Sequence, residues 1–156
     1  MRAVSPLIAA ILLIAFTVTT GVLVIQWGHN FVQRQVSCIG IDLVTYNLNK
    51  QANQITFSIK NRGTQSTDMQ YWFVKITDRT GTEYVCDFNT AATSAPSGGC
   101  VYKVVDQSNN PVSKLEPNTV YKAVVYLDPN TINVNNIEKI ELVNPDCAAV
   151  LPVPRI

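Results

Sequence analysis

The four cysteines have the most definite chemistry in this chain, and all of them follow residue 37. They are Cys38, Cys86, Cys100 and Cys147. An even number of cysteines confined to one part of a chain is typical of disulfides. Of the three possible pairings we favour Cys86–Cys100, which would close the base of the polar loop between them, and Cys38–Cys147, which would join the start of the domain to its end. A zinc site is the alternative, but it would require C-x2-C spacing and usually histidine near the cysteines, and neither occurs.

No set of residues predicts catalysis. The single histidine, His29, adjoins a long apolar segment, so no Ser–His or Cys–His pair can form in the rest of the chain. The carboxylates are scattered and form no calcium-loop motif, and no glycine-rich phosphate loop is present. We therefore expect no catalytic residue, no metal site and no cofactor, and we expect that the protein is not an enzyme.

Net charge argues against nucleic acid as a partner. Residues 36–156 contain 10 of the Lys and Arg residues and all 11 acids, which gives 10 − 11 = −1. A domain that binds phosphate backbones normally carries a basic patch, and this balance provides none.

An almost wholly apolar segment extends from Ala3 to Ile25. A helix rises about 1.5 Å per residue, so a helix of this length spans roughly 35 Å, enough to cross a bilayer core. The run is too long for a secretory signal and no A-x-A-like cleavage site follows it. We expect one helix over residues 4–35, with Ser5 as N-cap and Pro6 in the first turn. The large apolar residues expected to contact lipid or neighbouring helices are Leu7, Ile8, Ile11, Leu12, Ile14, Phe16, Val18, Val22, Val24 and Ile25.

Charge and polar residues set further expectations for this helix. Arg2 and the amino terminus precede it, so the short N-terminal end should stay inside the cell and the bulk of the chain outside. Thr17, Thr19 and Thr20 interrupt the apolar run. Their hydroxyls can bond to carbonyls one turn earlier, which makes them tolerable in an apolar setting.

The remainder of the chain predicts strands separated by turns. Apolar and polar residues alternate in several short runs, and clusters such as Asn61-Arg62-Gly63 and Asp78-Arg79-Thr80-Gly81 mark turns between them. Seven short strands at this spacing indicate an all-β sandwich and, with the helix, an α+β chain. The expected strands are 36–46, 54–60, 69–77, 82–87, 101–105, 119–127 and 137–143.

One local motif sharpens the sandwich prediction. The run Leu115-Glu116-Pro117-Asn118-Thr119-Val120-Tyr121 resembles the entry to the sixth strand of fibronectin type III and related immunoglobulin-like sandwiches. The resemblance implies a tyrosine corner, in which the Tyr121 hydroxyl bonds to backbone near Leu115. Trp72 is expected in the core between the sheets.

Two further expectations concern the surface. No N-x-[ST] sequon occurs, so any glycan would be O-linked, with Thr90, Thr93, Ser94 and Ser97 as candidates beside the alternative of a plain loop. The tail 148–156 is apolar with two prolines, so it cannot be a central strand. We expect it to lie along the outside of its own domain or against a neighbouring molecule.

The N-terminus resembles the archaeal type IV pilins. Met1-Arg2-Ala3, then Val4-Ser5-Pro6 and a long apolar helix, match a short basic leader followed by the Val-Ser-Pro opening of that family (class III signal peptide). The resemblance implies a leader of residues 1–3, cleaved between Ala3 and Val4 by a membrane peptidase, with Arg2 in the basic part. The glutamate that bacterial type IV pilins carry five residues into the mature helix is replaced here by Ile8, as in the archaeal branch.

A pilin-like role is therefore the first functional expectation. The resemblance implies a membrane-inserted precursor that an assembly machine extracts into an extracellular filament, through which the cell adheres to surfaces. Its partners would be copies of itself, the membrane, the leader peptidase and that machinery. The domains expected are the leader (1–3), the helix (4–35) and an extracellular sandwich head (36–156). The alternatives are a single-span surface protein whose head binds a ligand or partner, an archaeal flagellin-like subunit, and, between pilin and anchor, a minor pilin or tip adhesin.

Overall fold

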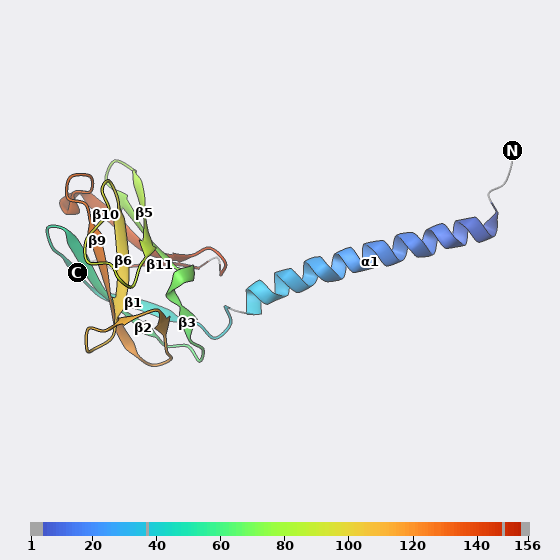
Figure 1. Cartoon of the computed structure of the whole chain (residues 1–156), viewed down its shortest axis with the longest axis horizontal. Coiled ribbons are helices and arrows are strands. Elements are labelled where there is room, and N and C mark those ends of the chain that lie inside the picture. Colours follow the sequence, from blue (N-terminus) through green and yellow to red (C-terminus); the bar gives the residue numbers. More distant parts are fainter. Residues whose placement is uncertain (1–4, 37, 148, 154–156) are drawn as a thin grey trace. The chain divides into compact units, whose positions relative to one another are not determined.

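A computed structural model describes residues 5–36, 38–147 and 149–153. The chain divides into two units, Met1–Ser37 and Cys38–Ile156 (Figure 1). The first unit contains the helix α1 (Pro6–Val36) and the second, the head, contains the strands. The strands are β1 (Leu43–Lys50), β2 (Gln54–Asn61), β3 (Thr67–Asp68), β4 (Phe73–Asp78), β5 (Glu83–Phe88), β6 (Cys100–Val105), β7 (Pro111–Val112), β8 (Lys114–Leu115), β9 (Val120–Leu127), β10 (Ile137–Asn144) and β11 (Ala149–Pro152), with short 3-10 turns η1 (Met69–Tyr71) and η2 (Val134–Asn136).

The α+β class with a sandwich-like head is confirmed, but the number of strands is larger than predicted. Eleven strands occur in the described part of the chain instead of about seven. The additional strands β3, β7, β8 and β11 have two to four residues each, too short for alternation of side chains to identify them in the sequence.

The strands of the head form one continuous sheet, not two separate ones. Its order is β1-β2-β9-β6-β5-β4-β10-β11, with β7 beside β6, and β3 and β8 form a separate ribbon. Strand β5 connects the two halves: its first part pairs antiparallel with β4, and Asp87 and Phe88 at its end pair parallel with β6. A strand that changes partners in this way turns a corner between two packed layers.

The two end strands of the sheet also approach each other. The Thr45 hydroxyl on β1 donates a hydrogen bond of 3.0 Å to the carbonyl oxygen of Pro152 on β11. The layers are thereby closed toward a barrel, which covers strand edges that would otherwise be exposed to other chains.

The core lies between the two layers and contains a short chain of hydrogen bonds among aromatic residues. Trp72, which is 3% exposed, occupies the predicted core position, and its indole N–H donates to the Thr67 hydroxyl at 3.0 Å. The Tyr102 hydroxyl donates to the carbonyl oxygen of Trp72 at 2.7 Å. Burial raises the pKa of Tyr102, so this hydroxyl keeps its proton. Each buried polar atom in this cluster thus has a partner, as a stable core requires.

The predicted strand 36–46 is wrong in its position. Helix α1 continues to Val36, and β1 begins only at Leu43. Between them lies a turn with Gly40 at a φ of +84°, a conformation that glycine adopts readily. The strand then extends beyond residue 46 because a bulge at Asn47, with a φ of 55°, lets it continue to Lys50.

The predicted strand 69–77 begins too early, because Met69–Tyr71 forms the turn η1 and the strand β4 begins at Phe73. In the tail, residues 149–152 form β11 along the outer side of β10, with Val153 buried. The tail therefore lies along its own head, as a strand beside the last long strand. Ala148 and residues 154–156 lie outside the described residues.

Candidate functional site

Helix α1 is the most distinctive feature of the molecule. Its segment Pro6–Val32 is, by length and composition, one that could cross a membrane. At 1.5 Å per residue its 27 residues span about 40 Å. Pro6 occupies the first turn, and the carbonyl of Ser5 accepts the first helical hydrogen bond, from Ala9, at 3.2 Å. The residues expected at a leader cleavage, Arg2, Ala3 and Val4, lie outside the described residues.

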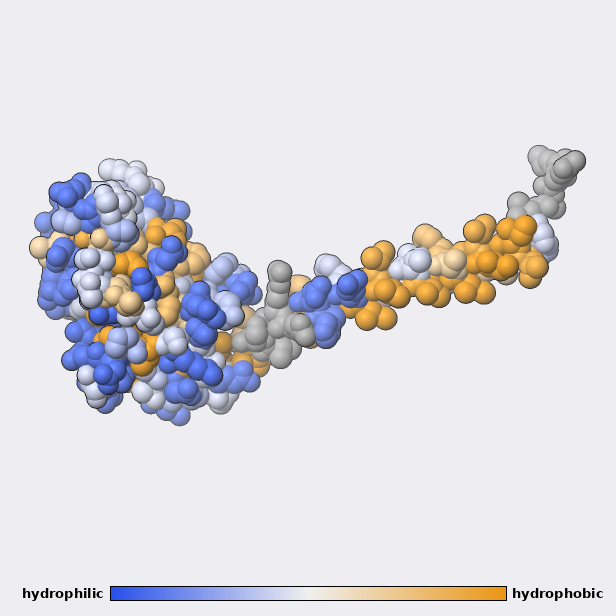
Figure 2. Space-filling model, in the orientation of Figure 1, coloured by the Kyte–Doolittle hydropathy of each residue, from blue (hydrophilic) through white to orange (hydrophobic). Residues whose placement is uncertain are grey.

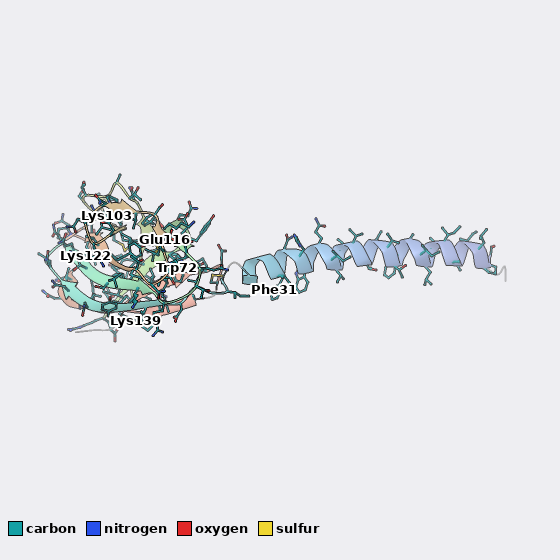
Figure 3. All side chains as sticks on the ribbon, turned by 90° about the horizontal axis from the view of Figure 1, so that it is seen from below. Phe31, Trp72, Lys103, Glu116, Lys122 and Lys139 are labelled. Carbon is teal, nitrogen blue, oxygen red and sulfur yellow. A yellow bond between two sulfur atoms is a disulfide. The ribbon has the colours of Figure 1, made fainter. Side chains whose placement is uncertain are left out.

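The large apolar side chains of α1 are exposed on every side of the helix. Figure 2 shows a mostly orange surface along α1 that paler atoms interrupt near the middle, and Figure 3 shows side chains directed outward from both visible edges of the ribbon. The ten residues predicted to contact lipid or other helices are each between 52% and 72% exposed. All ten residues therefore lie on one helix, and within the single chain each of their side chains stays more than half exposed.

The hydroxyls of the threonines in the middle of α1 donate hydrogen bonds to backbone carbonyl oxygens of the same helix. Thr17 donates to the carbonyl oxygens of Leu13 and Ile14, and Thr20 donates to that of Phe16 at 2.8 Å. Thr19 donates in the same way to the carbonyl oxygens of Ala15 and Phe16. Because these hydroxyls need no external partner, the patch is compatible with lipid and with a packed bundle.

The apolar surface ends in an aromatic pair. Trp27 and Phe31, one helical turn apart, stack with ring centroids 5.7 Å apart and planes inclined by 14°. Gln26, His29 and Asn30 bring polar groups to the same turn of the helix. An exposed tryptophan with polar neighbours at the end of an apolar span is typical of a membrane–water interface.

The segment that follows the helix is fixed to the head. Cys38 forms a disulfide with Cys147, with Cα atoms 5.5 Å apart. The carbonyl oxygen of Gly40 accepts from the N–H groups of Thr64 and Gln65 at 2.8 and 3.0 Å. Residues 38–42 are therefore held both covalently and by hydrogen bonds to the β2–β3 loop.

A buried asparagine organises that β2–β3 loop. The Asn61 side chain is fully buried, donates to the carbonyl oxygens of Gln65 and Leu115, and accepts from the N–H of Gly63. Arg62 adds an exposed ion pair with Asp42, 3.1 Å between nitrogen and oxygen. From the sequence, Asn61-Arg62-Gly63 was predicted only as a turn. No local pattern shows that this turn contacts residues 38–42, the segment that follows the helix.

The other disulfide and the tyrosine corner lie within the head. Cys86 and Cys100 are bonded, with Cα atoms 4.8 Å apart, where β5 changes partners from β4 to β6. Both disulfides are the pairs that the sequence favoured. The Tyr121 hydroxyl accepts the N–H of Glu116, next to buried Leu115, at 2.9 Å, and Pro117 is partly buried beside them. This hydrogen bond is the tyrosine-corner contact that the sequence predicted for Tyr121.

The side chains that could bind a metal ion do not converge in the part of the chain that the structure describes. Across residues 5–36, 38–147 and 149–153 there is no group of three His, Cys, Asp or Glu side chains able to hold a metal ion. His29 is on α1, in the other unit from the carboxylates of the head. The loop residues considered for O-linked glycans, Thr90, Thr93, Ser94 and Ser97, are all exposed, and their modification stays a prediction.

Comparison with known proteins gives a limited result. No protein-family model matches the chain, and no curated protein matches it. Among solved structures, it is similar to the archaellum periplasmic stator protein FlaG from Sulfolobus acidocaldarius, with 18% identity and a TM-score of 0.49, over 72% of this chain and 96% of that one. It is also similar to the stator complex of FlaF and FlaG from the same organism, with 16% identity and a TM-score of 0.47, over 69% of this chain and 84% of that one.

Proposed function

We propose that this chain is the structural subunit of an extracellular, archaeal type IV pilus-like filament that polymerises through α1. Before assembly, the subunit is inserted in the membrane through α1, with its head outside the cell. A peptidase removes the leader, and the assembly machinery draws the subunit into the growing filament. Adhesion to surfaces is the role that the pilin resemblance implies, and the protein has no catalytic function.

The observation that carries this proposal is the exposure of α1 on all sides. Burying one large aliphatic side chain is favourable by about 1.5–3 kcal/mol relative to water. The ten predicted contact residues alone would therefore amount to roughly 15–30 kcal/mol, at or above the free energy of unfolding of a typical domain, about 5–15 kcal/mol. A helix of this kind has to be covered all round, and one flat partner cannot do that.

Lipid and a bundle of identical helices both provide such cover. Hydrophobic transfer from lipid to a bundle is close to neutral, because lipid tails are as apolar as the side chains. A machine can therefore move the helix from one to the other against a small free-energy difference. A contact between copies that does not close into a ring produces an open helical polymer.

A second candidate is a single-span surface protein that does not polymerise. The Trp27–Phe31 pair favours it, because such a pair is suited to a permanent position at the membrane surface. In that case the head would bind a ligand or partner while each molecule remains in the membrane.

Electron microscopy of material sheared from cells that produce the protein separates the two candidates. We expect filaments that contain the chain without its leader, so mass spectrometry of their N-terminal peptide should find Val4 as the first residue. Protein that remains dispersed in the membrane would contradict the filament and favour the anchored protein. Filaments that begin with Met1 would contradict only the leader.

Bulky apolar substitutions on the helix test the bundle itself. Ala9, Ala15 and Gly21 follow one another at six-residue intervals, so at 100° per residue they lie about 120° apart around α1. Substituting each one separately with Leu leaves the helix fully apolar, so membrane insertion should be unchanged in all three. A bundle that surrounds the helix must contact at least one of these positions, and there the larger side chain should reduce filament yield.

Leu23→Ile, which conserves volume, is the matched control and should retain wild-type yield. Normal yield in all three Leu variants would show that no close helix contact surrounds α1 and would contradict the polymer.

A further inference from the structure

A groove lined by both polar and apolar side chains crosses the outer face of the head. It lies over strands β2 and β9 and has a volume of about 520 Å³, within the range of about 300–1,000 Å³ typical of small-ligand sites. Ser58 on β2 and Lys122 on β9 are paired in the sheet and lie on its floor. Two raised segments border it, the bulge of β1 on one side and the β6–β7 turn on the other. Figure 3 labels Lys122 on the head.

The first border exists because of the bulge in β1. Tyr46 pairs with Ser58 and Asn49 with Thr56, so three steps along β1 correspond to two along β2. The extra residue shifts the alternation: Leu48 is buried in the core, while Asn47 and Asn49 on either side of it are both exposed. Unbroken alternation from buried Leu43 would direct Asn47 and Asn49 toward the core and Leu48 toward solvent, so the extra residue of the bulge is what brings both amides to the outer face.

The second border is a turn held in one conformation. The Asp106 carboxylate accepts the N–H groups of Ser108 at 2.8 Å and Asn110 at 2.9 Å. Asn109 has a φ of 63°, the left-handed conformation that asparagine tolerates. Val105, just before this turn, pairs with Lys122 in the sheet, and Lys122 lies on the groove floor. The turn is therefore next to the floor and forms one border of the groove.

The groove presents amides whose hydrogen-bonding capacity is unused. Asn47, Asn49, Gln107 and Asn109 line it, and within the described residues none of their side-chain amides makes a hydrogen bond to the protein. A carboxamide offers two donors and an acceptor, so these side chains can bond to groups that both donate and accept. Hydroxyls are groups of that kind.

The charges in the groove nearly cancel. Lys122 contributes a cation and Asp106 an anion, and the Asp106 carboxylate is already occupied by its turn. A groove without excess charge has no long-range attraction for a polyanion or a polycation. Its chemistry therefore favours a neutral ligand rich in hydroxyls.

We propose that this groove binds a short stretch of neutral oligosaccharide, with the amides of Asn49 and Gln107 bonding to sugar hydroxyls from opposite borders. The site belongs to the head alone, so it does not depend on whether the chain polymerises.

Titration of the isotopically labelled full chain in detergent micelles tests the proposal by NMR. The probes are maltotriose, mannotriose and chitotriose, with trigalacturonate as the charged comparison. We expect saturable shifts of backbone N–H signals from the β1 bulge and the β6–β7 turn with at least one neutral trisaccharide. Asn49→Ala combined with Gln107→Ala should weaken that binding at least about tenfold.

The matched control is Asn130→Ala combined with Asn135→Ala, which removes two exposed amides outside the groove and should leave binding unchanged. Absence of shifts with all three neutral sugars would overturn the proposal, as would equal binding by the groove variant. Stronger binding of trigalacturonate than of the neutral sugars would overturn the assignment to a neutral ligand. The groove lies within the head, so none of these results depends on filament formation.

Discussion

Gly63 lies directly against the backbone of Gly40. A Cβ atom placed on Gly63 would be 2.0 Å from the carbonyl oxygen of Gly40, closer than any real contact. That carbonyl is the one that accepts the N–H groups of Thr64 and Gln65. The close approach of two glycines is therefore what lets the segment after the helix lie on the β2–β3 loop.

We expect Gly63→Ala to destabilise the head by about 3 kcal/mol, because the obstructing atom is backbone and cannot move without breaking these hydrogen bonds. Urea unfolding of the full chain in micelles, followed by circular dichroism, measures the change. Gly99→Ala is the matched control, since its new Cβ would meet only Pro96 at an ordinary 3.6 Å. Equal stability of both variants would show that the loop adapts freely and that this contact does not position the segment.

The hydroxyl of Tyr102 should contribute measurably to the core. Tyr102→Phe removes the donor to the carbonyl oxygen of Trp72 and leaves that buried acceptor without its 2.7 Å partner. We expect a loss of about 1–2 kcal/mol in the free energy of unfolding. Tyr71→Phe, at a site that is 55% exposed, is the control and should stay within about 0.5 kcal/mol of the wild type. A loss of the same size at both positions would assign the effect to something other than this hydrogen bond.

The two disulfides should differ in what they contribute. They close loops with sequence separations of 14 and 109 residues. In the loop-entropy description these correspond to about 3 and about 5 kcal/mol. In urea unfolding, the double Cys→Ala variant at Cys38 and Cys147 should therefore lose more free energy of unfolding than the double Cys→Ala variant at Cys86 and Cys100. The reverse order would mean that the corner between β5 and β6 depends on its disulfide for its geometry as well as for entropy.

Acid should weaken the head through its turns. The pKa of Asp106 is lowered because its carboxylate accepts the N–H groups of Asn110 and Ser108, and the pKa of Asp128 is lowered mainly by the N–H of Gly98. The hydroxyl of Thr80 lowers that of Asp78. A carboxyl whose folded pKa lies below its unfolded value near 3.8 contributes stability above that value and loses it as pH falls through the folded pKa.

The melting temperature should therefore be level from neutral pH to about pH 5 and fall below about pH 4. Asp106→Asn and Asp128→Asn should each lower the melting temperature at pH 7 and reduce the further fall in acid. Asp87→Asn, an exposed strand residue outside the turns, is the comparison and should retain the wild-type profile. An acid profile that none of the turn variants changes would contradict this account.

The sequence predicted the long elements well because their signals are local. Most of helix α1 is one apolar run, strand β2 alternates apolar and polar residues, and β9 is rich in branched and aromatic residues, so composition and period are sufficient. The pairing Cys86–Cys100 also followed from a local feature, the polar loop between the two cysteines.

What the sequence did not predict depends on contacts between distant residues. The bulge at Asn47 appears in the sequence only as a break in alternation, and its meaning depends on how β1 pairs with β2. The same holds for the groove, whose borders lie about sixty residues apart in the chain, and for β5, whose parallel pairing with β6 no local pattern indicates. Gly63 was predicted in a turn, but Gly40 was placed inside the expected strand 36–46, and no local pattern shows that the two glycines are in contact.

The depth of Trp27 in a bilayer provides the last test of how α1 is used. The apolar part of the helix from Pro6 to Ile25 has 20 residues and spans about 30 Å, the thickness of a bilayer core. With that part inside the hydrocarbon, Trp27 lies at the headgroup level on the outer side, where its N–H stays hydrated.

The fluorescence of Trp27 in vesicles should be quenched strongly by bromine placed high on the acyl chain and weakly by bromine near the chain end. Trp72 is buried in the head, so the signal lost in Trp27→Phe isolates the membrane contribution. Strong quenching from the chain end would place Trp27 in the hydrocarbon and show that the span is shifted toward Phe31. Equal, weak quenching at both depths would mean that α1 does not insert, and the membrane-inserted precursor would then be wrong.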